Sequence, residues 1–69
     1  MVTVKQILSK LASKRLNLHR GNGYQYFVYD DPAHNIYKER TINVNRLNDL
    51  SLDQWVQEGR DFLDHVEGN

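Results

Sequence analysis

The chain contains no cysteine, and this absence excludes two common ways of stabilising a small domain. Disulfides and zinc sites built on thiolates are both impossible without it. A chain of 69 residues forms one domain at most and buries only about 60% of the surface that its unfolded form exposes, so its stability is marginal. The sequence therefore predicts a single domain, residues 1–69, that depends on a small, well-packed core or on self-association.

Long apolar runs are also missing. No segment approaches the ~18 consecutive apolar residues of a membrane span. The first residues, MVTVKQILSKLASK, place lysines inside the apolar pattern and so lack the continuous apolar stretch of a secretory signal. The apolar fraction of 39% and the charged fraction of 26% are typical of a folded domain. We expect a cytoplasmic protein that does not associate with membranes.

Motifs that carry catalysis are absent as well. The three histidines, His19, His34 and His65, show no metal-ligand spacing, and the chain has no serine elbow or glycine-rich phosphate loop. Asp30 and Asp31 could form an acid–base pair, but adjacent residues point to opposite sides of an extended backbone. The sequence predicts a protein that is not an enzyme and that uses no cofactor or metal.

Neither sign of charge is in excess, but the charged residues are unevenly distributed along the chain. The net charge is zero, yet the first twenty residues hold five basic side chains and no acidic one, whereas six acids follow from residue 49 onward against Arg60 alone. The five basic residues are Lys5, Lys10, Lys14, Arg15 and Arg20. Two interpretations stay open: the basic segment binds an anionic partner, or the two ends of the chain pack together and neutralise each other.

Apolar residues at helical spacing predict a helix near each end of the chain. The first runs from about residue 4 to 16 and begins at a capping box formed by Thr3 and Gln6. We expect Leu16 and Leu18 to pack at the exit of this helix, before a loop rich in glycine and asparagine. The second helix follows Ser51 and carries one apolar stripe, formed by Leu52, Trp55, Val56, Gly59, Phe62, Leu63 and Val66. Glycine disfavours a helix, so Gly59 within the stripe indicates the close approach of another backbone.

Two extended segments lie between the helices. Residues 24–30 are rich in aromatic and β-branched residues, and residues 40–46 alternate polar and apolar side chains. The second segment could begin earlier, near Ile36, and the turn between the two contains Pro32, the only proline. An isolated hairpin is barely stable in water, so the helices must cover one face of it. The sequence predicts a two-layer α+β domain with the order αββα.

The alternation of side chains along a strand decides which residues stay accessible. If Tyr26 and Val28 pair with Val44 and Ile42, the face toward the helices is apolar throughout. The opposite face then forms the expected partner-binding surface, with Arg40 at its margin; its other members are Phe27, Tyr29, Thr41, Asn43 and Asn45. The alternative register buries Phe27 and exposes two tyrosines instead.

Exposed aromatic side chains and arginine are typical of protein-binding hot spots, which makes binding to another protein the predicted function. Free sheet edges could also pair with a second copy of the chain, giving a homodimer. The alternative is nucleic-acid binding, with bases stacked on the aromatic sheet and phosphates on the basic helix. The neutral total charge and the acidic last helix argue against this alternative.

Two stretches, GYQYFVYDDPAHNIYKE and INVNRLNDLSLDQWVQEGRDFL, resemble a group of small uncharacterised proteins encoded by bacteriophages and prophages. The matching positions are Gly23–Asp31 and Ile42–Val56, and the chain departs from the pattern at Gln25, where an aromatic residue is usual. The resemblance implies an accessory protein that binds a host or phage protein, for example as an inhibitor of a host or defence factor. We expect the RLND stretch, Arg46–Asp49, to shape the turn before the last helix.

Overall fold

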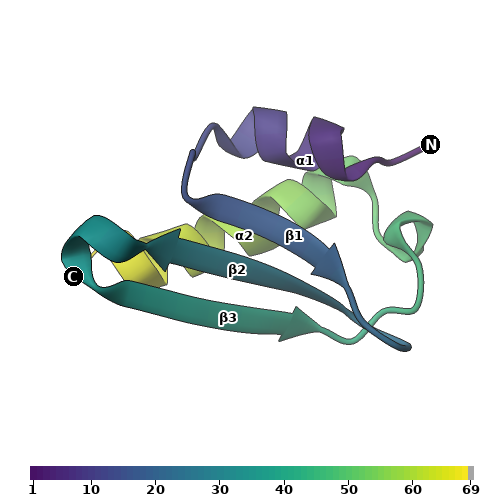
Figure 1. Ribbon diagram of the computed structural model, residues 1–69. Coiled ribbons are helices and arrows are strands. Elements are labelled where there is room, and N and C mark those ends of the chain that lie inside the picture. Colours follow the sequence, from purple (N-terminus) through teal and green to yellow (C-terminus); the bar gives the residue numbers. More distant parts are fainter. Residues whose placement is uncertain (69) are drawn as a thin grey trace.

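The computed structural model describes residues 1–68, which fold into two helices, three strands and two short 3-10 turns (Figure 1). The elements in chain order are α1 (Val4–Leu11), β1 (Leu16–Arg20), β2 (Gln25–Asp31), η1 (Pro32–His34), β3 (Ile36–Ile42), η2 (Leu47–Asp49) and α2 (Leu52–Glu67).

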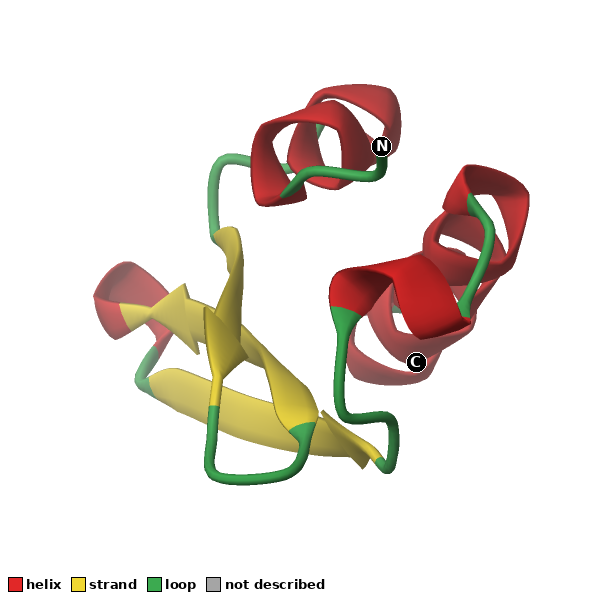
Figure 2. Ribbon diagram, turned by 90° about the vertical axis from the view of Figure 1, so that its right-hand side faces the viewer, coloured by secondary structure: helices red, strands yellow, loops and turns green. Residues whose placement is uncertain are grey.

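The three strands form one antiparallel sheet in the order β1-β2-β3, and both helices lie on the same side of it (Figure 2). The predicted α+β class is confirmed, as is the coverage of an antiparallel sheet on one face by the N- and C-terminal helices. The sheet has one strand more than the predicted hairpin, because residues 16–20, which we expected to form a helix exit and a loop, form β1.

Local signals in the sequence set both helix starts. Thr3 Oγ1 accepts from Gln6 N at 3.2 Å and Ser51 Oγ accepts from Gln54 N at 3.1 Å, so both predicted capping boxes are present. The helix α1 is shorter than predicted, because Ala12 adopts a left-handed conformation with φ of 54° and donates its N–H to Leu8 O. The early stop releases residues 16–20 to enter the sheet.

The strand register follows the alternative that buries Phe27. In β2, Phe27 lies opposite Leu18 of β1 and Arg40 of β3, while Gln25 lies opposite Ile42. The strand β3 ends at Ile42, so the predicted continuation to residue 46 is wrong, and its start at Ile36 agrees with the earlier beginning that the sequence left open. Phe27 and Tyr29 therefore face the helices.

The core lies between the sheet and the two helices, with Phe27 at its centre. Phe27, Trp55 and Ile7 have no exposed surface, and the Phe27 ring meets the Trp55 ring edge-on with centroids 6.0 Å apart. Trp55 also donates its indole N–H to Leu47 O at 2.7 Å, which satisfies its one polar atom. The apolar stripe predicted for the second helix is the face that packs here, as its buried members show: Trp55, Gly59, Phe62 and Leu63.

Gly59 allows α1 and α2 to pack closely. A Cβ atom at this position would lie 2.3 Å from Leu11 Cδ1, closer than van der Waals contact permits. The neighbour is thus a buried side chain of α1 and not the backbone that we expected from the sequence. The glycine costs some helix propensity and in exchange leaves room for Leu11 in the core.

We predict that Phe27→Ala lowers the free energy of unfolding by about 3–5 kcal/mol, because it leaves a cavity between the sheet and Trp55. Urea unfolding followed by circular dichroism measures the loss. Tyr37→Ala, which also removes an aromatic ring but at a position 58% exposed, should change the free energy by no more than about 0.5 kcal/mol. Equal losses in the two variants would contradict this position for Phe27.

Candidate functional site

The side of the sheet away from the helices is not covered by any other described element (Figures 1 and 2). We call the side chains on this side the open face. They alternate with the core residues of each strand, and Tyr24 joins them from the turn before β2. The members of the open face are Asn17, His19, Tyr24, Tyr26, Val28, Asp30, Tyr37, Glu39 and Thr41.

Tyr26 is the centre of an aromatic cluster on the open face. Its ring centroid lies 5.5 Å from that of His19 and 5.9 Å from that of Tyr24. On its other side it lies opposite Thr41 of β3, and a shallow hollow of about 460 Å³ borders Tyr24, Tyr26, Glu39 and Thr41. The rings thus present partly exposed apolar surface beside hydroxyl and carboxylate groups.

The turn between β1 and β2 positions the Tyr24 ring. Gly21 N donates to Tyr24 O at 2.8 Å, and Gly23 adopts a positive φ of 85°, a conformation that favours glycine. A Cβ atom on Gly21 would lie 2.3 Å from Tyr24 Cζ, so the ring packs directly against the bare backbone of Gly21. The glycine therefore provides the space in which Tyr24 approaches Tyr26.

A second aromatic group, Tyr37, extends the open face along β3. Its hydroxyl donates to Glu39 Oε2 at 2.8 Å, and 58% of the residue is exposed. This hydrogen bond, with smaller contributions from desolvation and the charge of Glu39, raises the pKa of Tyr37. The phenol is therefore protonated at neutral pH, and its ring remains available for contact.

Two of the residues predicted from the sequence to bind a partner lie in the core. Phe27 has no exposed surface and Tyr29 is 3% exposed, so the prediction that they form an accessible surface is wrong. The Tyr29 hydroxyl donates to Glu67 Oε2 of α2 at 2.8 Å, and this bond, together with burial, raises the pKa of Tyr29. Arg40 is on the same side of the sheet, where Nη2 lies 3.5 Å from Glu58 Oε1.

The other three predicted residues are exposed but do not share one face. Thr41 belongs to the open face, opposite Tyr26. Asn43 and Asn45 follow the end of β3, and the backbone of Asn45 is engaged on both sides: its N–H donates to Asp49 Oδ2 and its carbonyl accepts from Gln25 Nε2. The structure thus brings only Thr41 together with the accessible aromatic rings.

A difference of three residues in the pairing explains these corrections, because Ile42 lies opposite Gln25 and not opposite Val28. Side chains alternate faces along a strand, so a shift by an odd number of positions exchanges the two faces. The strand missed in the sequence, β1, places Leu16 opposite Tyr29 and Leu18 opposite Phe27, which makes a continuous apolar row toward the helices. The spacing of Leu16 and Leu18, two residues apart in LNLHR, is the signal that could have identified this strand.

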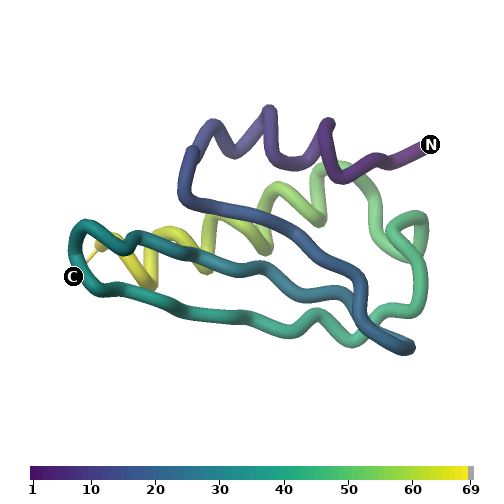
Figure 3. Tube along the Cα trace, in the orientation of Figure 1, coloured from purple at the N-terminus to yellow at the C-terminus, as the bar shows by residue number. Residues whose placement is uncertain are grey.

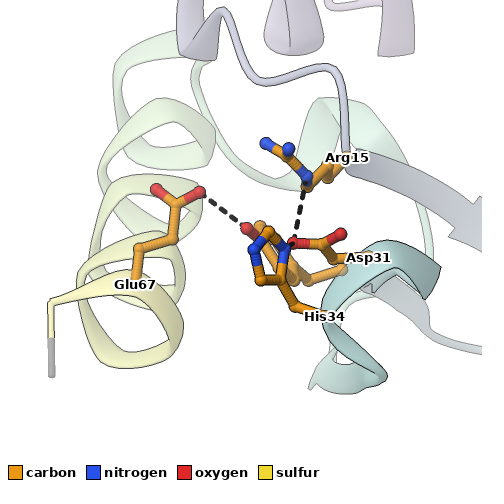
Figure 4. Close-up of polar contacts among 5 residues, drawn as sticks. Arg15, Asp31, His34 and Glu67 are labelled. Carbon is orange, nitrogen blue, oxygen red and sulfur yellow. Dashed lines mark hydrogen bonds and ion pairs between the residues drawn. The ribbon is translucent and has the colours of Figure 1, made fainter.

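A cluster of polar side chains joins the sheet to its flanking segments at the opposite end from the β1–β2 turn (Figure 4). Asp31 Oδ2 lies 3.2 Å from Arg15 Nε and 2.8 Å from His34 Nδ1, and the Asp31 side chain is 7% exposed. Burial acts to raise the pKa of Asp31, but the hydrogen bond from His34 and the charge of Arg15 outweigh it, so the pKa is lowered. A carboxylate can only accept, so His34 Nδ1 carries the proton.

The cluster of Arg15, Asp31 and His34 has a structural role. Asp30 is exposed while Asp31 is buried, as expected for neighbours on a strand, so the two carboxylates do not converge on one site. Arg15 precedes β1 and His34 belongs to η1, so their bonds to Asp31 hold the segment before β1 and η1 to the end of β2. Within residues 1–68, no group of three or more histidine, aspartate or glutamate side chains could hold a metal ion.

The basic and acidic helices do not neutralise each other by direct ion pairs. The two helices pack together, but the ion pairs among residues 1–68 involve Arg15, His34 and Arg40 and none of the lysines of the N-terminal segment. Lys5, Lys10 and Lys14 are all exposed. The lysines thus form a basic surface of α1 and the residues after it, separate from the open face.

The chain matches no protein-family model, and no curated protein and no solved structure is significantly similar to it. The resemblance to phage and prophage proteins therefore stays a prediction. In the part of the chain that the structure describes, neither helix has the length and apolar character needed to cross a bilayer.

We predict that Gly21→Ala displaces the Tyr24 ring from Tyr26 without destabilising the fold. The added methyl group would occupy the position of the ring, but Tyr24 is 38% exposed and its ring can swing toward solvent. The expected results are the loss of nuclear Overhauser effects between the two rings and a change in unfolding free energy of no more than about 0.5 kcal/mol. Retained contacts between the rings would contradict the proposed role of Gly21.

We predict that Asp31→Asn destabilises the protein at pH 7 and that this effect fades in acid. Because folding lowers the pKa of Asp31, its ionised form adds stability above the usual aspartate pKa of about 4, and this stability is lost as the pH falls through the lowered pKa. Urea unfolding of both proteins between pH 7 and pH 2 tests this sign. Asp30→Asn, at the exposed neighbouring position, serves as control. If the difference in unfolding free energy between the wild type and Asp31→Asn is the same at every pH, the stabilising role of the ionised Asp31 carboxylate is refuted.

Proposed function

We propose that the protein acts by binding another protein through the open face, and that it is not an enzyme. The observation that supports this most directly is the position of Tyr24, Tyr26 and Tyr37, three of the four tyrosines, on the side of the sheet that no described helix covers. A folded domain of this size gains stability from every ring that it buries, so rings left on an uncovered face indicate a contact with another molecule.

The chemistry of the open face suits a protein partner. Tyrosine contributes a large, rigid contact area at a small entropic cost, and it is enriched at binding hot spots. Here Val28, which is 7% exposed, lies two residues from Tyr26 on β2 and opposite Asn17 of β1. Neutral hydrogen-bonding groups such as Asn17 and Thr41 accompany the tyrosines on this face. The strands beneath them are fixed by the core, so little order has to be gained on binding.

The open face of the sheet is better suited to binding a partner than the two edge strands, β1 and β3. At the β3 edge, Lys38 and Arg40 point toward the helix side, and charged side chains in such positions oppose the addition of another strand. The other edge strand, β1, has α1 packed close to it (Figure 1). Pairing of backbones at an edge, which the sequence suggested as a route to a homodimer, is therefore less favoured than docking on the open face.

The resemblance noted in the sequence supports a biological context for this binding. The resemblance implies an accessory protein that acts by stoichiometric binding, so the proposed partner is a host or phage protein whose activity is altered by the contact. An inhibitor of a host or defence factor is the form of this role that we propose.

The second candidate is nucleic-acid binding, and the unpaired lysines favour it. Lys5, Lys10 and Lys14 form no ion pair with any described acid, so their charges remain available to phosphate groups. The open face could stack bases at the same time. Glu39 and Asp30 on or beside that face would repel the phosphates, which is why we place this function second.

Two variants separate these functions, and each serves as the control for the other. We predict that the double variant Tyr26→Ser/Tyr37→Ser loses capture of a protein partner from cell extract, because both changes remove exposed ring surface and leave the core intact. The triple variant Lys5→Gln/Lys10→Gln/Lys14→Gln should retain that capture. The measurement is a nuclease-treated pull-down with tagged proteins, combined with sedimentation equilibrium to detect a homodimer.

The reverse pattern would support the second candidate. In that case the wild type binds single-stranded oligonucleotides in a salt-sensitive way and the triple variant does not. If the double variant captures the same proteins as the wild type and sediments like it, the open face is not the binding surface.

A further inference from the structure

A second site lies at the end of the molecule where α1 begins and where η2 lies beside the N-terminal segment (Figure 3). There a groove of about 440 Å³ opens between the N-terminal segment, the sheet and the segment before α2. This volume lies within the range of about 300–1,000 Å³ that is typical of small-molecule sites. Its polar walls include Arg20, Gln25 and Arg46 beside Asn48, and its apolar walls include Val2, Val4 and Leu47 beside Met1.

The two arginines of this groove carry uncompensated charge. Both are exposed, and the ion pairs found among residues 1–68 involve neither of them. The acid nearest in sequence, Asp49, directs Oδ2 to the backbone N–H groups of Asn45 and Arg46, at 3.1 and 3.0 Å. No described acidic residue lines the groove. Planar guanidinium groups bind carboxylate and phosphate oxygens in pairs, so the groove has the charge and the donors for an oxyanion.

Gln25 adds a fixed polar group to the wall of the groove. It is 2% exposed, and its Nε2 donates to Asn45 O at 3.1 Å, which orients the amide. No described hydrogen bond reaches Oε1 of the same side chain, and no buried side-chain oxygen or nitrogen among residues 1–68 lacks a partner, so Oε1 is an accessible acceptor at the groove. An amide oxygen only accepts, so Oε1 can bind water or a donor group of a ligand but not the oxyanion itself.

The apolar part of the groove restricts the kind of ligand. Val2, Val4 and Leu47 are partly buried and pack against the core, and they leave an apolar wall beside the two guanidinium groups. An ion without an apolar part would use only the arginines and would leave this wall in contact with water. A ligand with both an anionic group and an apolar part would contact the arginines and the apolar wall at the same time.

We propose that this groove binds an oxyanion, a carboxylate or a phosphate, attached to a small apolar or aromatic body. The inference does not rest on the proposed function, because the groove and the open face are formed by different residues. The oxyanion lies between Arg20 and Arg46, and the apolar body lies against Val2, Val4 and Leu47. Such a group occurs in free metabolites and at the C-terminus of a peptide that ends in an apolar residue.

The experiment is a titration of the isotopically labelled full-length chain, followed by amide chemical shifts at low salt and pH 7. The probes are phenyl phosphate, benzoate, inorganic phosphate and the neutral benzyl alcohol. We expect phenyl phosphate and benzoate to bind more tightly than inorganic phosphate, with shifts at Val2, Gln25 and Leu47, and benzyl alcohol to bind weakest. Arg20→Gln and Arg46→Gln should each reduce the affinity about tenfold, since each removes a charge-assisted contact.

Two further comparisons make the test specific. Lys14→Gln removes one positive charge outside the groove and should leave the affinity unchanged, and thermal unfolding shows whether each arginine variant keeps its fold. A tetrapeptide with a C-terminal leucine, compared with its amide, distinguishes a peptide terminus from a free small molecule. The proposal is overturned if Lys14→Gln weakens binding as much as the arginine variants, or if the folded arginine variants bind all probes like the wild type.

Discussion

The structure depends on the contact between the central strand and the long helix, where Phe27 meets Trp55. Both side chains are without exposed surface, and their edge-on arrangement places the middle of β2 against the first turn of α2. A chain this short has one small core, so the residues that enter it are chosen by the strand face that packs here. Once Phe27 points to the helices, Tyr29 must do so as well, and Tyr26 and Val28 must point away.

The open face follows from this choice and is not an independent feature. The segment from Tyr26 to Tyr29 is aromatic or β-branched at every position, so whichever face is buried, the other retains large side chains. The buried set contains Phe27, which has no polar atom, and Tyr29, whose hydroxyl reaches Glu67. Exposure of Tyr26 keeps its hydroxyl on the solvent side, where water can satisfy it. The open face, which we propose as the binding surface, therefore consists of the strand side chains that do not enter the core.

The two ends of the sheet each contain a buried polar side chain, and the charged groups around these two side chains differ. At one end the buried carboxylate of Asp31 is paired with Arg15 and His34, so its hydrogen bonds are made within the protein. At the other end Gln25 is even more buried, but the charges near it are the unpaired guanidinium groups of Arg20 and Arg46. A buried polar group with satisfied partners stabilises the fold, whereas one beside uncompensated charge is suited to a ligand.

The sequence by itself determined the elements whose signals are local: both capping boxes, the apolar stripe around Trp55, and the α+β class with helices on one face. It did not determine the strand register, because the run from Tyr26 to Tyr29 lacks the polar alternation that would identify its inner face. That decision came from tertiary contacts: the early stop at Ala12 released β1, and β1 set Leu16 and Leu18 beside Tyr29 and Phe27. Accessibility of an aromatic ring is a property of the packed layers, which residues distant in the sequence create together.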